Sequence, residues 1–143
     1  MCLATTRWDS DTGNTDGFYG LRREQLQDLV EYWHTSFDWR AAEARINAYC
    51  HYRLDVDGVP VHVMHRPGVG PDPVSLILSH SWPWTFWHWS KVVDRLADPG
   101  AHGGDPADAF DVIVPSLPGF GFSTPLAQPD MNFWKIADVW HIL

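Results

Sequence analysis

The predicted fold is organised around one short segment, Ser79-His80-Ser81-Trp82-Pro83-Trp84. An apolar run, residues 74–78, precedes it. The residues after it have helical spacing, at i, i+3, i+7 and i+10: Phe86, Trp89, Val93 and Leu96. The stretch is therefore predicted to be a sharp loop between a strand and a helix. Ligands bind at the carboxyl ends of strands in open α/β sheets, and N–H groups near a helix N-terminus favour negative charge. We expect this loop to hold an oxyanion, although it contains no nucleophile.

The segments before this loop alternate in polarity, as half-buried strands do. Residues 52–56 and 59–64 each show the pattern, and Asp57-Gly58 between them predicts a two-residue hairpin turn. Two further apolar segments, residues 74–78 and 110–114, are predicted to be short buried strands. We therefore expect an antiparallel hairpin followed by two strands of a parallel sheet.

Helical spacing of apolar residues is found toward both ends of the chain. Residues 21–34 and 39–48 are predicted helices, with Asp38 as the N-cap of the second. A last helix is predicted to begin near Asn132. Residues 98–106 are too rich in glycine and proline for regular structure, so a turn-rich insertion is expected there.

The order of these elements favours the α/β fold class, because short apolar strands alternate with helices after an initial hairpin. We divide the chain into three parts. Residues 1–20 lack periodicity and are predicted to form a flexible arm. Residues 21–50 form a helical segment, and residues 51–143 form the α/β region.

Composition excludes several classes of function. The formal charge of −8 leaves no basic face for nucleic acid. No apolar run approaches the roughly 20 residues of a membrane span, and the N-terminus has no signal-peptide core, so a cytoplasmic location is expected. Cys2 and Cys50 make no disulfide framework or metal motif. We expect Cys50 to be a small buried hydrophobe.

Two loops are predicted to follow neighbouring strands, and both resemble motifs of a known family. His80-Ser81-Trp82-Pro83 resembles the His-Gly-Xaa-Pro motif of the microsomal-type epoxide hydrolases of the α/β-hydrolase superfamily. Residues 115–123, Pro-Ser-Leu-Pro-Gly-Phe-Gly-Phe-Ser, resemble the loop after that family's fourth strand. Glu31-Tyr32-Trp33 and residues 37–47 resemble its N-terminal domain. The resemblance covers about residues 21–143 and implies a partial α/β-hydrolase sheet preceded by a helical segment.

The resemblance also implies a reaction, the two-step hydrolysis of a small apolar epoxide to a diol. In the family an aspartate opens the epoxide and forms an ester, and a histidine oriented by an acidic residue activates the water that cleaves it. The backbone N–H of Trp82 would be one oxyanion donor, a role worth roughly 2.7–4 kcal/mol. Pro83 would follow a cis peptide bond. Trp84, Phe120 and Phe122 are expected in the wall of an apolar pocket, and no cofactor or metal is implied.

The sequence departs from the family pattern in two ways. Ser81 replaces the usual motif glycine, which suggests strain if the position has positive φ. The nucleophile, the acid, the base and the cap domain lie further along the family's sequence, so we expect this chain to be an N-terminal fragment that is inactive alone. The family's strand order would leave residues 75–79 at a bare sheet edge, which predicts self-association or pairing with a complementary C-terminal chain. The alternative is a non-catalytic binding fragment that uses the Trp-lined loops.

The remaining candidate residues are predicted to have structural roles. His62 and His65 are three apart on a strand and point to opposite faces, so they are poor metal co-ligands. Gly119 and Gly121 lack the third glycine of a dinucleotide fingerprint. His88 and His141 lie on predicted helices with no partner histidine at i+4 and are predicted to be surface or packing residues. His102 lies in a glycine-rich turn and is not expected to bind metal.

Overall fold

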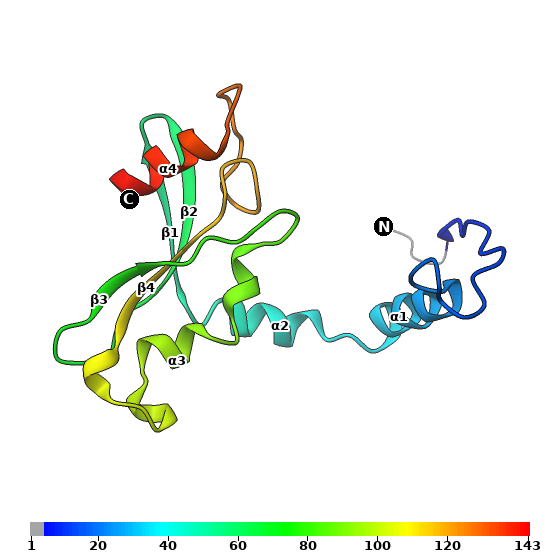
Figure 1. The fold of residues 1–143 in the computed structure, drawn as a ribbon, viewed down its shortest axis with the longest axis horizontal. Coiled ribbons are helices and arrows are strands. Elements are labelled where there is room, and N and C mark those ends of the chain that lie inside the picture. The colour runs from blue at the N-terminus through cyan, green and yellow to red at the C-terminus, as the bar shows by residue number, and fades with distance from the viewer. Residues whose placement is uncertain (1–4) are drawn as a thin grey trace. The chain divides into compact units, whose positions relative to one another are not determined.

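The computed structural model describes residues 5–143, so Cys2 lies outside the described residues. The chain divides into two compact units, one up to Glu43 and one from Ala44 onward. The first unit contains α1 (Arg23–Thr35), and the division falls within α2 (Trp39–Ile46) (Figure 1). Asp38 caps α2 as predicted, because its carboxylate accepts a hydrogen bond of 3.0 Å from the N–H of Ala41.

The predicted hairpin is confirmed. Strands β1 (Cys50–Val56) and β2 (Val59–Arg66) pair in antiparallel fashion, with Val56 opposite Val59. Asp57 and Gly58 form the turn with φ of 52° and 79°. Positive φ at both central residues defines the type I′ turn, whose twist matches that of the flanking strands.

We expect Gly58→Ala to reduce the free energy of unfolding by about 1–2 kcal/mol, because a side chain in the left-handed region brings its Cβ against the following carbonyl oxygen. A Cβ at this position would also lie 3.3 Å from the side-chain nitrogen of Gln128. Urea denaturation measures the change. Gly103 has a similar φ of 83° with nothing within 4 Å, so Gly103→Ala is the matched control for the backbone cost alone. Equal stability of Gly58→Ala and the parent chain would contradict the turn assignment.

The four strands form one mixed sheet in the order β1-β2-β4-β3. Strand β4 (Phe110–Pro115) pairs antiparallel with β2 and parallel with β3 (Val74–Ile77). The expected α/β class, an antiparallel hairpin joined to parallel strands, is therefore confirmed. Strand β3 lies at an edge of the sheet, as Figure 1 shows, and none of Leu76, Ile77 and Leu78 is fully buried.

Each face of the sheet carries its own apolar cluster. Side chains alternate along β2, so Met64 faces one side and Val63 the other. Met64 belongs to the cluster with Val93 of α3 (Val93–Ala97), and Val63 to the cluster with Val139 of α4 (Phe133–Ile142). The helices α3 and α4 therefore cover opposite faces of the sheet.

Three local predictions need correction. The single helix expected over residues 86–96 is divided into a 3₁₀ helix, η2 (Phe86–Trp89), and α3. The aromatic and β-branched residues of this stretch are weak helix formers, and Phe86 is instead buried in the core. Residues 98–106 include regular turns, since 3₁₀ helices span Gly100–His102 and Pro106–Asp108. Cys50 is exposed, because it begins the edge strand β1.

Candidate functional site

His80 connects the two loops that follow the parallel strands. Its ring is 3% exposed, and its Nε2 accepts a hydrogen bond of 3.0 Å from the N–H of Leu117. An accepting Nε2 places the hydrogen on Nδ1, which donates to the carbonyl oxygen of Ser81 at 3.0 Å. One buried imidazole therefore fixes both the turn after β3 and the start of the loop after β4.

Residues 81–84 form a tight turn in which the N–H of Trp84 donates to the carbonyl oxygen of Ser81 at 2.9 Å. The Trp82-Pro83 peptide bond is cis, as predicted, which makes this a type VI turn. Within the described part of the chain, no acceptor lies within hydrogen-bonding distance of the Trp82 N–H. Ser81 does not have positive φ, so the strain suggested by the missing glycine is absent at this position.

A largely apolar cavity of about 920 Å³ lies beside this turn. It is bordered by the β3 turn, the β4 loop and the first residues of α4: Ser79, His80, Ser81, Trp82, Leu117, Pro118, Gly119, Phe120, Leu126, Met131, Asn132, Phe133 and Ile136. Phe120, which was predicted for the wall of an apolar pocket, is one of these lining residues. Trp84 and Phe122 lie outside this lining, Trp84 against His88 and Phe122 against His62 and Phe86.

His62, predicted to have a structural role, forms a buried polar pair with His51, a residue that the sequence analysis did not single out. His62 is 5% exposed, and its Nε2 lies 2.9 Å from Nδ1 of His51. Its Nδ1 lies 2.9 Å from the hydroxyl oxygen of Ser116. Burial, and then the electrostatic interaction with His51, lowers the pKa of His62 to about 4. The hairpin register could have predicted this pair. His62 lies opposite Arg53, so His51, two residues before Arg53, is a diagonal neighbour of His62 on the same face of the sheet.

Other polar clusters in the α/β unit hold elements together away from the cavity. His65 contacts the carboxylate of Asp111 at 3.0 Å, and Tyr49 donates to the carboxylate of Asp94 at 2.8 Å. Burial and that carboxylate raise the pKa of Tyr49 to about 12. Arg66 also contacts Asp94, at 3.1 Å. No group of three or more metal-ligating side chains is found over residues 5–143.

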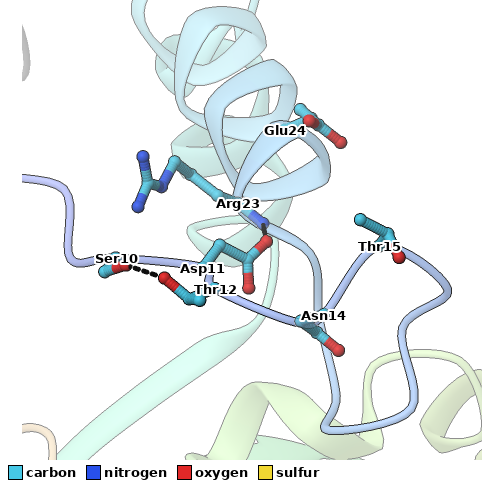
Figure 2. A pocket seen from close by; sticks show the side chains of 7 residues that line it. All are labelled: Ser10, Asp11, Thr12, Asn14, Thr15, Arg23 and Glu24. Carbon is cyan, nitrogen blue, oxygen red and sulfur yellow. Dashed lines mark hydrogen bonds between the residues drawn. The ribbon is translucent and has the colours of Figure 1, made fainter.

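The N-terminal unit has a polar hollow of about 320 Å³ at the start of α1 (Figure 2). The carboxylate of Asp11 accepts a hydrogen bond of 2.8 Å from the backbone N–H of Arg23. This bond lowers the pKa of Asp11 and satisfies one free N–H at the helix start. The polar groups of the hollow therefore serve to cap the start of α1.

None of the helices in the described part of the chain is long and apolar enough to cross a bilayer.

Comparison with known proteins points to one family. The family described as Epoxide hydrolase N terminus matches residues 1–89. A putative epoxide hydrolase of Stigmatella aurantiaca is 42% identical over 138 residues, which cover 96% of this chain and 31% of that protein. The crystal structure of juvenile hormone epoxide hydrolase from Bombyx mori aligns with a TM-score of 0.83 at 25% identity, over 98% of this chain and 33% of that one.

A third relative agrees with these two. The structure of Aspergillus niger epoxide hydrolase aligns with a TM-score of 0.80 at 27% identity, over 96% of this chain and 36% of that one. The chain therefore spans about a third of the length of the relatives it matches. Similarity to named hydrolases along nearly the whole chain does not favour the alternative of a non-catalytic binding fragment.

Proposed function

The chain belongs to the epoxide hydrolase family, where it corresponds to the N-terminal part, and we propose that it supplies the oxyanion-binding turn and one wall of the substrate pocket. The reaction is the hydrolysis of an epoxide to a diol through an aspartyl ester. The nucleophilic aspartate, the histidine base and its acidic partner are proposed to lie outside residues 1–143. On this view residues 1–143 alone bind part of the substrate but do not turn it over.

The unpaired N–H of Trp82 is the observation that carries this proposal. An aspartate carboxylate attacks an epoxide carbon, the C–O bond breaks, and the alkoxide takes a proton. Water then loses a proton to the histidine base and attacks the carbonyl carbon of the ester, which gives a tetrahedral intermediate with one negatively charged oxygen. A backbone N–H that has no acceptor among residues 5–143, as is the case for Trp82, can stabilise that oxygen without reorganisation. Collapse of the intermediate releases the diol and restores the carboxylate.

The turn also has the rigidity that an oxyanion donor needs. His80 holds the carbonyl of Ser81 from one side, and the N–H of Trp84 holds the same carbonyl from the other. The Trp82 side chain is 76% exposed, so its ring does not fix the backbone by burial. The apolar cavity beside the turn suits an apolar epoxide, because most of its lining is hydrocarbon and aromatic surface.

The test is a chimera in which residues 1–143 replace the matching segment of the Stigmatella aurantiaca relative. We expect the chimera to hydrolyse styrene oxide, and Trp82→Pro to lower its kcat by about 10²–10³-fold, because proline removes the N–H. Trp82→Phe keeps the N–H and is expected to retain most of the activity. The 143-residue chain, assayed in parallel, is expected to give no turnover. Equal loss in the two Trp82 variants, or turnover by the chain alone, would contradict the proposal.

A further inference from the structure

A buried chain of hydrogen bonds runs from the end of α2 to the loop after β4, and its direction can be assigned. Nε2 of His51 lies 2.9 Å from the carbonyl oxygen of Ile46, which can only accept, so this nitrogen carries the hydrogen. Nδ1 of neutral His51 is then an acceptor, and Nε2 of His62 must donate to it. Nδ1 of His62 is left as an acceptor for the hydroxyl of Ser116. Every polar atom of both rings has one partner of the correct type.

Both ends of the loop after β4 are attached to His62. The N–H of Ser116 donates to the carbonyl oxygen of His62 at 2.8 Å. At the other end, the hydroxyl of Ser123 accepts from the N–H of His62 at 2.9 Å and donates to the carbonyl oxygen of Ser116 at 2.8 Å. Phe86 and Phe122 cover the ring at centroid distances of 4.7 and 5.1 Å. His62 therefore holds the two ends of the loop together, and its ring is buried away from water.

The loop has little freedom to adopt another position while these bonds are intact. Gly121 has a φ of 51°, and a Cβ there would lie 3.1 Å from the hydroxyl oxygen of Ser116. The same loop carries Phe120, which lines the cavity, and the N–H of Leu117, which holds the ring of His80. If the loop moved at Ser116, Phe120 in the cavity wall would therefore move with it. The hydrogen bond from Leu117 to His80, which supports the 81–84 turn, would change as well.

We propose that His62 is a positioning residue, which fixes the 116–123 loop through Ser116 and Ser123 and thereby sets the cavity wall and the orientation of His80. Its role in an epoxide site rests on the proposed function, whereas the anchoring of the loop does not. His51 supports His62 from β1 by fixing the tautomer of its ring.

Hydrogen–deuterium exchange mass spectrometry of the full 143-residue chain at micromolar concentration tests the proposal. We expect Ser116→Ala to raise exchange in peptides spanning 115–125 by roughly tenfold, the size expected for one lost buried hydrogen bond. We also expect faster exchange of the C2 hydrogen of His80, whose ring hydrogen bonds go to Ser81 and Leu117 and not to Ser116. His65→Gln is the control for general destabilisation. It removes a hydrogen-bonded imidazole from β2, the strand that carries His62, at a site where the partner is Asp111.

Ser123→Ala tests the other end of the loop and serves in place of Ser116→Ala if that variant does not fold. Unchanged exchange at 115–125 in a folded variant would overturn the proposal, as would a loosened loop with unchanged His80 exchange. Equal effects in His65→Gln would overturn it too, because they would show general destabilisation. None of these readouts requires epoxide turnover, so an inactive chimera would leave this inference standing.

Discussion

Val74→Lys is expected to shift self-association of the 143-residue chain to concentrations at least about tenfold higher, a change of roughly 1.4 kcal/mol in association free energy. Over residues 5–143, β3 pairs with β4 along one edge and with no strand along the other. Residues 75–79, Ser-Leu-Ile-Leu-Ser, are uncharged and contain no proline. Such an edge is a template for pairing with another chain, and a lysine on it is a common protection.

The other edge of the sheet explains why β3 is the expected point of association. Strand β1 is also an edge strand, but it carries the charges of Arg53 and Asp55. Val74 is 65% exposed, so lysine there replaces little buried surface. Sedimentation velocity over a concentration series, together with binding of an apolar dye, measures the effect.

Val69→Lys is the matched control for Val74→Lys. Val69 is 48% exposed and lies in the loop before β3, so the variant makes the same change of side chain and charge away from the strand edge. We expect it to associate nearly as the parent chain does. An equal shift in both variants would show that net charge, rather than the edge of β3, governs association. A parent chain that is monomeric and does not bind dye would show that the edge is protected.

Lowering the pH from 7 to 4 is expected to reduce the free energy of unfolding by up to about 3 kcal/mol through His62 alone. Its pKa is about 4 in the folded chain, against an ordinary value of 6.5, and each unit is worth about 1.36 kcal/mol. Between these values the unfolded chain binds the proton and the folded chain does not, so stability falls as the pH falls through this range. Below pH 4 both states are protonated, and the contribution stays lost.

The neighbours of His62 make it the group to test. Its ionisable contact is His51, and Arg53, opposite in register, directs its guanidinium to the carbonyl oxygen of Thr124. The other groups around the ring are hydroxyls and phenyl rings. Urea denaturation of dilute protein at pH 7, 6, 5 and 4 gives the profile.

His62→Gln is expected to be less stable than the parent chain at pH 7 and to approach it toward pH 4, because the substituted side chain does not titrate. His65→Gln, on the same strand, is the control for removing a hydrogen-bonded imidazole. Parallel profiles for the parent and His62→Gln would show that the acid sensitivity arises from other groups.

Several elements of this protein could be predicted from the sequence, because they depend on interactions between residues close together in the chain. The I′ turn at Asp57-Gly58 fixes the hairpin and its register, because few residue pairs accept positive φ twice in succession. Asp38 and Asn132 cap their helices within three residues along the chain, so their role does not depend on distant packing. The motif around His80 likewise identified the turn that adjoins the cavity, and with it the family.

Contacts between side chains far apart in the sequence could be identified only from the folded structure. Residues 86–96 have helical spacing, but burial of Phe86 among weak helix formers divides them into two short helices. Trp84 and Phe122 are aromatic residues in the right loops, yet both pack outside the cavity. The contact of His62 with Ser116 joins residues 54 positions apart. It depends on the pairing of β2 with β4, which results from burial of apolar side chains on both faces of the sheet and leaves no local signal in the sequence.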